Sequence, residues 1–497
     1  IRDLVRSRGL GDVYKRQELF TTPITLYIIN ALLIITVIFN ERKSSSAILA
    51  WIMVMTFIPV LGFILYLVLN QNISRRKINK MTENEEKVIS SAIRTQMESM
   101  DGGTYQFNSE STEKWKHLIK LNHVYGSSYY TQDNEIELIT DGNQLMKALV
   151  EDIKKAKKSV NVEFFIIKRD KTGRDFIDVL TQKAREGVEV RLLMDALGSR
   201  YITRGVLSDY LAAGGKVGYF FKPKFIFLGL KLNYRNHRKI TVIDNKIAYI
   251  GGYNVAKEYV GKKKKFGYWR DTHIKIQGSS VHDLNARFVL DWRFTTKEKI
   301  EVLTEAESVS MWKMGNKGVQ ILSSGPEDPK EEIKRAFMKM ITYAERNVYV
   351  QTPYFVPDQS ILESLKMASQ SGADVRVMIP CMPDHPFVYW ATYSYIGELL
   401  RSGARVWIYD NGFLHAKTLV VDGEVASVGS TNFDNRSFRL NFETNAIIYD
   451  QEFARQMEKT FENDMLKGHE LTLAQYNKRS IIIRLKEVVS RLLSDIL

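Results

Sequence analysis

The sequence carries one arrangement of histidine, lysine, aspartate and asparagine twice. In each copy the lysine follows the histidine by two residues, the aspartate by seven and the asparagine by seventeen. The copies are His237, Lys239, Asp244 and Asn254, and His415, Lys417, Asp422 and Asn432. Because alternate residues of a strand project from one face, each copy presents an imidazole beside an ammonium group. A nucleophile or proton carrier next to a fixed positive charge is what a phosphate ester requires.

A short turn before each asparagine suits close contact with a phosphate. It contains Gly252 in the first copy and Ser430 in the second. A glycine backbone can approach the phosphate closely, and the asparagine amide adds a hydrogen-bond donor. Two copies related by a pseudo-twofold axis would place two histidines around one phosphorus, one to attack and one to carry the proton. The lysines supply the positive charge, so we expect no metal ion and no other cofactor.

Strands and helices alternate around these motifs and predict an α/β fold made of two homologous halves. In the first half we expect strands at 160–167, 188–194 and 240–243, and helices at 143–156 and 174–185, the first capped by Asp141. The second half repeats the order. Asn347-Val348 resembles Asn161-Val162, and the Gly-x-x-Val-Arg run at 372–376 resembles that at 187–191. The halves should span residues 131–300 and 310–465.

The composition narrows the choice of partner. The chain has 497 residues, with 71 Lys and Arg against 57 Asp and Glu, and a net charge of +14. This excess indicates a polyanion, either nucleic acid or an anionic membrane. Cys381 is the only cysteine, which excludes an internal disulfide and a cysteine-rich zinc site and indicates a reducing compartment.

Two uncharged segments near the N-terminus favour the membrane. Residues 19–39 and 47–69 hold 21 and 23 residues without a charge, and each is long enough for a bilayer core of about 30 Å. We therefore expect a transmembrane hairpin over 19–69; the alternative is a signal peptide followed by one buried core helix. The larger excess of Lys and Arg after the second segment places the catalytic domain on the cytoplasmic side. No nucleic-acid partner is expected.

The remaining segments are predicted from composition. Residues 1–18 resemble the translation of a transposon end used in sequencing libraries, so we expect a cloning or assembly scar there. Residues 70–130 are polar and are expected to form a linker with one exposed helix around 83–97. The C-terminal tail, 470–497, is predicted to be amphipathic, because its apolar and charged residues fall on different helical faces. Such a helix either lies in the membrane interface or docks on the catalytic domain.

Taken together, these residues resemble the phospholipase D superfamily and, more narrowly, the bacterial cardiolipin synthases. The resemblance covers the chain from Leu19 to its C-terminus. Besides the two His-x-Lys motifs, it rests on Gly-Tyr-Trp-Arg-Asp-Thr-His at 267–273, on Gln-Thr-Pro-Tyr-Phe-Val-Pro-Asp at 351–358 and on the Pro-Asp-His-Pro run that begins at 383. The N-terminal hairpin is also characteristic of those synthases. The resemblance implies a multi-pass protein of the bacterial cell membrane.

The resemblance also implies a reaction and roles for the motif residues. A phosphatidyl group leaves one phosphatidylglycerol, forms a phosphohistidine and passes to a second phosphatidylglycerol, which gives cardiolipin and glycerol. The catalytic pattern carries over to both His, Lys and Asp sets, with His237 assigned as the nucleophile and His415 as the general acid and base. The motif aspartates are expected to brace a strand by pairing with nearby bases.

Two further roles follow from the resemblance. Each histidine of related enzymes is oriented by a carboxylate, and the matching positions are Asp271 and Glu443, reaching across to His415 and His237. Asn254, Asn432 and Ser430 are expected to bind the substrate phosphate. The family often has serine where this chain has Gly252, so a hydroxyl contact is expected only at Ser430.

Two other functions remain as alternatives. A phospholipase D-type hydrolase or nuclease would pass the phosphohistidine to water, although a membrane hairpin does not help a nuclease. A non-catalytic lipid-binding protein would not need two intact motifs.

Overall fold

The computed structural model describes residues 23–40, 45–69, 81–221, 234–302, 314–328 and 330–492. The predicted scar at 1–18 lies outside the described residues. The chain divides into two compact units. One contains residues 1–71, 223–233 and 492–497, and the other contains 72–222 and 234–491. We call them the N-terminal unit and the catalytic unit.

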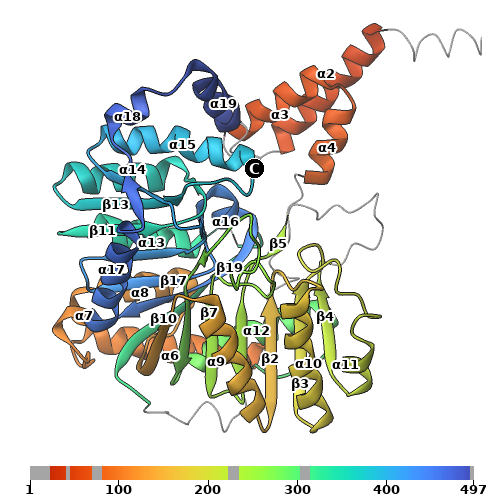
Figure 1. Ribbon diagram of the computed structural model, residues 1–497, viewed down its shortest axis with the longest axis vertical. Coiled ribbons are helices and arrows are strands. Elements are labelled where there is room, and N and C mark those ends of the chain that lie inside the picture. Colours follow the sequence, from red (N-terminus) through yellow and green to blue (C-terminus); the bar gives the residue numbers. More distant parts are fainter. Residues whose placement is uncertain are drawn as a thin grey trace, which may run out of the picture. The chain divides into compact units, whose positions relative to one another are not determined.

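The N-terminal unit has three described helices, coloured red and orange in Figure 1. They are α2 (Pro23–Asn40), α3 (Ser45–Phe57) and α4 (Leu61–Leu69). The second uncharged segment is thus divided at Pro59, which has no N–H group to continue the helix, and Val60 follows with a φ of 64°. Within the described parts of the chain, no helix combines the length and apolar character that a bilayer crossing needs.

The strands of the catalytic unit repeat in the two halves. The first half has β1 (Thr131–Ile139), β2 (Ser159–Phe164), β3 (Glu189–Asp195), β4 (Lys216–Phe220), β5 (Arg235–Asn236), β6 (Ile240–Ile243), β7 (Ile247–Gly251), β8 (Trp269–Arg270) and β9 (His273–Gln277). The second half has β10 (Lys317–Ser324), β11 (Asn347–Gln351), β12 (Phe355–Val356), β13 (Asp374–Pro380), β14 (Arg405–Tyr409), β15 (Phe413–Leu414), β16 (Thr418–Val421), β17 (Val425–Gly429), β18 (Phe433–Asp434), β19 (Asn441–Tyr449) and β20 (Gly468–Glu470).

One sheet runs through both halves, and its strand order reveals the symmetry. From its edge toward the centre the first half reads β4-β3-β2-β6-β7-β9-β1, and the second half, inside an additional edge strand β20, reads β14-β13-β11-β16-β17-β19-β10. The two central strands, β1 and β10, pair antiparallel. Because a twofold axis between antiparallel neighbours exchanges them, the sheet has the pseudo-twofold arrangement that the duplicated motif predicts. The fold is therefore mixed α/β with two halves.

The helices follow the same duplication. The first half has α9 (Gly142–Lys155), α10 (Lys171–Arg185), α11 (Ser208–Ala212) and α12 (Ser280–Thr296). The second half has α13 (Glu332–Thr342), α14 (Gln359–Gln370), α15 (Pro386–Arg401), α16 (Asn435–Arg439) and α17 (Gln451–Met465), and the tail forms α18 (Leu473–Asn477) and α19 (Ile481–Leu492). Asp141 caps α9, as expected, by accepting hydrogen bonds from Asn143 and Gln144.

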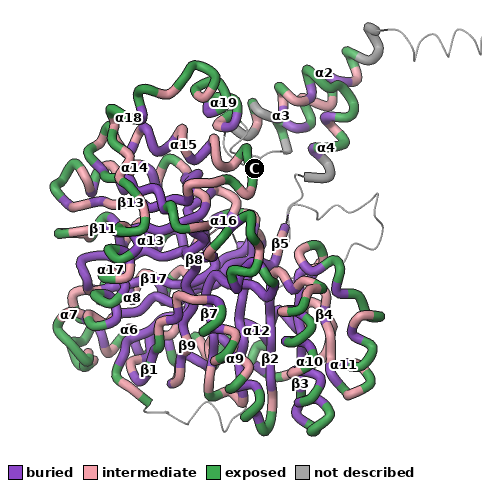
Figure 2. The backbone as a smooth tube through the Cα atoms, viewed as in Figure 1, coloured by how far each residue is buried: buried purple, intermediate pink, exposed green. Residues whose placement is uncertain are grey.

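Each half has its own apolar core, and a third core joins them. The first contains residues of α9, α10, β2 and β3, and the second contains residues of α13, α14, β11 and β13. The third crosses the centre of the sheet, where Ile136 of β1 and Val319 of β10 belong to one cluster. Figure 2 shows the buried backbone concentrated along these strands. The halves are thus one packed body, so residues of both can meet in a single site.

The strand register corrects one correspondence between the halves. Ser159 pairs with Glu189 in the first half, and Asn347 pairs with Asp374 in the second. Ser159 and not Asn161 is therefore the counterpart of Asn347. The sequence comparison was wrong by two residues, a shift that keeps the same strand face and so leaves the apolar pattern unchanged.

The segment at 70–130, predicted as a linker, also differs from its prediction. Its described part forms α6 (Glu83–Asp101), α7 (Glu110–Lys114) and α8 (Lys116–Gly126). Trp115, Leu118 and Ile119 are buried in the core of the second half. A helix was expected near 83–97, but the packed turns after it were missed, because only a few apolar residues per turn are needed to attach a helix to a core supplied by other elements.

Candidate active site

Short strands that cross between the halves position both motif histidines. β5 pairs in parallel with the start of β19, and the backbone N–H of His237 donates to the carbonyl of Phe442 at 2.9 Å. In the same way β15 pairs with β8, and the N–H of His415 donates to the carbonyl of Arg270 at 2.7 Å. Glu443 follows Phe442 in the chain, so it lies next to His237. Asp271 follows Arg270, so it lies next to His415.

The side chains at these crossings form two histidine–carboxylate pairs. Nδ1 of His237 lies 3.0 Å from both carboxylate oxygens of Glu443, and Nδ1 of His415 lies 2.5 Å from Oδ2 of Asp271. These are the partners that the family resemblance implied. The imidazoles keep 10% and 9% of their side-chain surface exposed, whereas both carboxylates are fully buried. The imidazoles are thus the accessible ends of the two pairs.

Both motif lysines are buried beside the histidines. Lys239 donates to the backbone carbonyl of His237 and lies over the ring of Phe165, 5.5 Å from its centre. Lys417 donates to the carbonyl of His415, and its Nζ lies 2.8 Å from Nδ1 of the same residue. Burial lowers the pKa of Lys239 to about 7 and that of Lys417 to about 8. An anion beside either lysine would restore its charged form.

Electrostatics join the two motifs into one site. Burial lowers the pKa of both His237 and His415 to about 4, and Lys417 contributes to the shift at both residues. Burial opposes ionisation of Glu443 and Asp271, but the adjacent histidines and lysines outweigh it and lower the pKa of both carboxyls. Near neutral pH each imidazole is therefore neutral, donates its Nδ1–H to a carboxylate and keeps a lone pair on Nε2.

The motif aspartates brace backbone turns instead of facing a phosphate. Asp244 accepts hydrogen bonds from the N–H groups of Lys157, Lys158 and Ser159 at 2.7–2.9 Å. Asp422 accepts three equivalent bonds at the start of β11, also at 2.7–2.9 Å. The expected bracing role fits, but the partners are backbone amides and not bases. Asp244 and Asp422, which were predicted among the catalytic residues, therefore have a structural role.

Gly252 and Ser430 occupy matching places but support their carboxylates differently. A Cβ at Gly252 would lie 2.0 Å from Oδ1 of Asp271, so only glycine leaves room for that aspartate. Ser430, in contrast, donates its hydroxyl to Oε2 of Glu443, and Asn441 donates to Oε1 at 3.1 Å. The Ser430 hydroxyl, expected to contact phosphate, is thus engaged in positioning Glu443.

The two motif asparagines also have partners within the protein. Asn254 accepts from the N–H of Ile166 at 3.0 Å and donates to the hydroxyl of Tyr259 at 3.1 Å. Asn432 donates to Asp434 over a longer distance, 3.3 Å. Asn254 therefore supports the strand end, and Asn432 is the one of the two whose amide is held more loosely.

Sequence reasoning missed two buried arginines that secure the carboxylates. Arg238 donates to the carbonyl of Glu443 at 3.2 Å, to Thr444 at 2.9 Å and to Asp291 at 2.6 Å. Arg270 donates to the carbonyl of Asp271, to Thr272 at 3.0 Å and to Asp464 at 2.7 Å. Each set consists of a carbonyl, a threonine hydroxyl and an aspartate on the long helix of the half that holds the histidine, which is α12 for Asp291 and α17 for Asp464.

These arginines come from non-equivalent positions. Arg238 lies between the His and Lys of its motif, where the second motif has Ala416. Arg270 precedes its carboxylate residue, where the second half has Phe442. One crossing thus takes its arginine from the motif strand and the other from the carboxylate strand. Because the two arginines share no spacing relative to the motifs, no repeated pattern in the sequence marks them.

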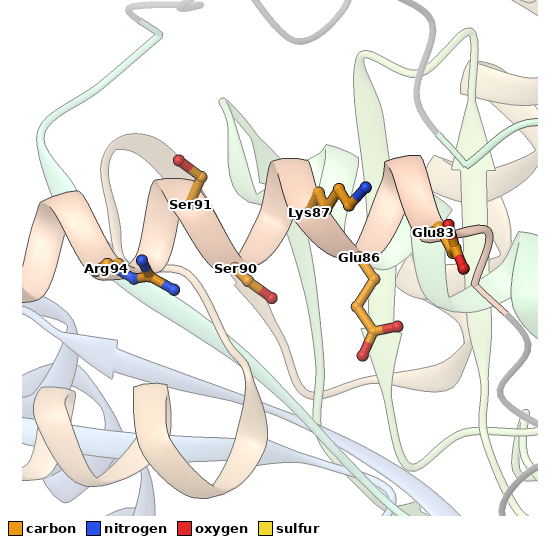
Figure 3. A pocket seen from close by; sticks show the side chains of 6 residues that line it. All are labelled: Glu83, Glu86, Lys87, Ser90, Ser91 and Arg94. Carbon is orange, nitrogen blue, oxygen red and sulfur yellow. The ribbon is translucent and has the colours of Figure 1, made fainter.

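A polar hollow elsewhere on the catalytic unit is distinct from this site. It is lined by residues of α6, namely Glu83, Glu86, Lys87, Ser90, Ser91 and Arg94 (Figure 3). None of the residues singled out by the motifs lines it. It therefore takes no part in the chemistry of the two histidine motifs.

The chain matches known families over most of its length. A family model described as "Cardiolipin synthase, PLD-like domain" matches residues 149–283 and 337–465, one stretch in each half. A second, described as the N-terminal domain of phospholipase D nucleases, matches residues 28–69.

Curated proteins and solved structures that are similar to the chain include two cardiolipin synthases and one phosphatidylserine synthase. The major cardiolipin synthase ClsA of Bacillus subtilis is 47% identical over 95% of this chain and 98% of its own length, and the cardiolipin synthase of Oceanobacillus iheyensis is 44% identical over the same shares. A crystal structure of a phosphatidylserine synthase from Haemophilus influenzae, 16% identical, covers 78% of this chain and 100% of its own with a TM-score of 0.59, which shows a common fold. The chain therefore belongs to the cardiolipin synthase family of phospholipase D-like proteins.

Proposed function

We propose that this chain is a phosphatidyltransferase that makes cardiolipin and glycerol from two molecules of phosphatidylglycerol. The observation that carries the proposal is the pair of histidine–carboxylate contacts across the halves, with both lysines beside them. Membership of the cardiolipin synthase family supports the same reaction.

In the first step, Nε2 of His237 attacks the phosphorus of the donor lipid. A P–N bond forms, the bond between phosphorus and the glycerol headgroup oxygen breaks, and His415 gives its proton to that oxygen. Glu443 holds His237 with Nε2 unprotonated, as a nucleophile requires. Lys239 and Lys417 offset the negative charge that grows on the phosphoryl oxygens.

His415 needs a proton for this step, although burial lowers its pKa to about 4 in the free protein. A bound phosphodiester brings a negative charge next to the imidazole, which raises that pKa. Asp271 stabilises the imidazolium once it forms. Substrate binding thereby supplies the condition for general-acid catalysis.

In the second step, His415 takes the proton from the terminal hydroxyl of a second phosphatidylglycerol. That oxygen attacks the phosphorus, the P–N bond breaks, and His237 is regenerated. The site returns to its starting protonation state, because the proton given to glycerol is replaced by the one taken from the acceptor.

Residues 19–69, which belong to the N-terminal unit, are proposed to form a transmembrane hairpin in a bacterial cell membrane, with the catalytic unit in the cytoplasm. Its support is the uncharged sequence, the match of residues 28–69 to a family N-terminal domain and exposed apolar side chains such as Tyr27, Leu32 and Phe39 on α2. A Ser44→Cys variant in a Cys381→Ser background should react with an impermeant maleimide from outside intact cells. A cysteine placed at Val124 should react only after lysis.

The reaction is tested by supplying the purified chain with radiolabelled phosphatidylglycerol in vesicles. The expected products are cardiolipin and glycerol in equal amounts, absent with His237→Ala. Release of phosphatidic acid without cardiolipin would contradict the proposal and favour a hydrolase. Binding without turnover would favour a lipid-binding protein.

A further inference from the structure

The C-terminal helix α19 lies on the catalytic unit with its polar side inward. Glu487 and Ser490 are buried, at 3% and 2% exposure. The apolar side chains point away from the protein and include Ile481 (82% exposed), Ile482 (63%), Leu485 (65%), Val488 (57%) and Val489 (44%). A surface helix in water shows the opposite arrangement, with its apolar stripe against the core.

Charged contacts hold the helix in this orientation. Arg479, just before α19, binds Glu487 with two hydrogen bonds, at 2.6 and 2.9 Å, and stacks over the ring of Tyr476. Because Glu487 is almost fully buried and paired through both oxygens, it fixes the rotation of α19 about its own axis.

A second set of contacts attaches α19 to α15. Arg491 binds Glu398 at 2.5 Å and lies over the ring of Tyr395, 4.4 Å from its centre. Lys486 lies over the ring of Trp390 at 5.2 Å. The helix is therefore clamped to a neighbour, and the exposure of its apolar side follows from this docking and not from detachment.

The charge of this region matches an anionic surface. Residues 478–492 contain five basic side chains and one acidic one. The acidic one is Glu487, which is buried with Arg479, whereas Lys478 and Arg484 are exposed. A helix with an apolar stripe flanked by lysine and arginine is suited to the boundary between headgroups and acyl chains of an anionic bilayer.

The same neighbour, α15, leads back to the active site. Just before α15, Asp384 accepts a hydrogen bond from Tyr354, and its charge acts on the pKa of His415. Phe387, in the first turn of α15, is 57% exposed. A single helix thus connects the exposed apolar face of α19 with the surroundings of a catalytic histidine.

We propose that α19 is a bilayer-docking face that fixes the orientation of the catalytic unit on an anionic membrane. Its apolar side chains enter the headgroup boundary while Arg479 and Arg491 hold the helix to the protein. Docking is a separate claim from cardiolipin synthesis, because it concerns where the unit lies and not which bond is made.

The test uses the full chain with Cys381→Ser and a fluorophore attached at Leu485→Cys. The matched control carries the fluorophore at Val124→Cys on α8, a site with 57% exposure. In vesicles of phosphatidylglycerol and phosphatidylcholine that contain a spin-labelled lipid, we expect quenching at position 485 and little at 124. Quenching by aqueous iodide should show the reverse order.

Two outcomes would overturn the proposal. Strong iodide quenching at 485 without lipid quenching would mean that the face stays in water. Protection of 485 from both quenchers would mean that protein covers it, either a second copy or the N-terminal unit.

A functional variant adds a second measurement. Leu485→Asp with Val488→Asp should lower turnover of phosphatidylglycerol in vesicles at least about tenfold, because both substitutions replace apolar surface that the bilayer would bury with charge. Turnover of a short-chain, monomeric phosphatidylglycerol should be unchanged, which separates loss of docking from loss of the active site. Equal losses with both substrates, or no loss with either, would contradict the docking role.

Discussion

The two histidine–carboxylate pairs reach the same geometry with different side chains. At His237 the partner is the longer Glu443, which also accepts bonds from Ser430 and Asn441. At His415 the partner is the shorter Asp271, and Gly252 leaves it room to approach. The extra carbon of the glutamate and the missing side chain of the glycine compensate each other. The symmetry therefore lies in the backbone and in the position of the imidazoles.

The lysines and arginines differ between the halves in the same way. Lys417 lies against the ring nitrogen of its own histidine, whereas Lys239 lies over Phe165. The arginine that secures each carboxylate comes from a different strand in each half. Each crossing thus has one lysine and one arginine, but these side chains lie in different positions at the two crossings. This difference allows the histidines to take different roles.

The largest effect is expected from neutralising either carboxylate. Glu443→Gln and Asp271→Asn remove the charge that holds each imidazole with Nε2 free, and each should lower kcat by about 10³-fold or more. Turnover of labelled phosphatidylglycerol, with thermal unfolding as a control for folding, measures this. If one variant lost less than about tenfold, the two crossings would not both be needed.

A smaller effect is expected from a substitution at Gly252, because it disturbs only the crossing that contains Asp271 and His415. Gly252→Ala would displace Asp271 and should reduce turnover by about 100-fold, since a shift of about 1 Å in a catalytic group has this effect. Gly205→Ala, where the nearest atom to an added Cβ lies 3.8 Å away, is the matched control and should keep full activity. Equal activity of the two variants would show that Asp271 tolerates displacement.

Next comes an effect on stability. Arg270→Met removes the buried charge partner of Asp464 at 2.7 Å and leaves only the half-exposed Lys467 at 3.7 Å, so it should lower the free energy of unfolding by about 3–5 kcal/mol. Arg238→Met should do the same through Asp291, although Arg287 also binds that aspartate at 2.7 Å and should soften the loss. Denaturant unfolding measures both. A double variant, Arg270→Met with Asp464→Leu, should recover part of the stability, and no recovery would contradict the pairing.

The smallest effect is a gradual pH dependence. Lys239 and Lys417 have lowered pKa values of about 7 and about 8, so the free protein loses their charge as the pH rises through that range. The histidines, with pKa values of about 4, remain neutral well below neutrality. We therefore expect kcat/KM to fall by up to about tenfold per pH unit as the pH rises above neutrality. A decrease on the acid side is expected only at a much lower pH, where the histidines become charged. A profile that is flat to about pH 9 would contradict the alkaline decrease.

The sequence predicted what depends on local spacing. The motif strands, the capped helix after Asp141 and the duplication could all be read from residue types at fixed intervals. The pairing of Asp271 and Glu443 came from a family resemblance, and the structure supplied its cause in the crossing strands β5 and β8.

The rest depends on contacts between distant residues. The exchange of Arg238 and Arg270 between strands leaves no common spacing, and the hydroxyl of Ser430 could equally have faced a phosphate. The outward apolar side of α19 is set by Glu398 and Glu487, whose partners cannot be assigned from helical periodicity alone. The helices α7 and α8 were missed because the core that buries them belongs to later residues.

The division of labour between the histidines is tested most directly by trapping the intermediate. A phosphatidyl ester of p-nitrophenol suits this test, because its leaving group needs no proton from His415. With this substrate, His415→Ala should release one equivalent of p-nitrophenol and retain the phosphatidyl group on His237, whereas His237→Ala should do neither. Covalent label in both variants, or in neither, would contradict a single site with one nucleophile and one acid–base.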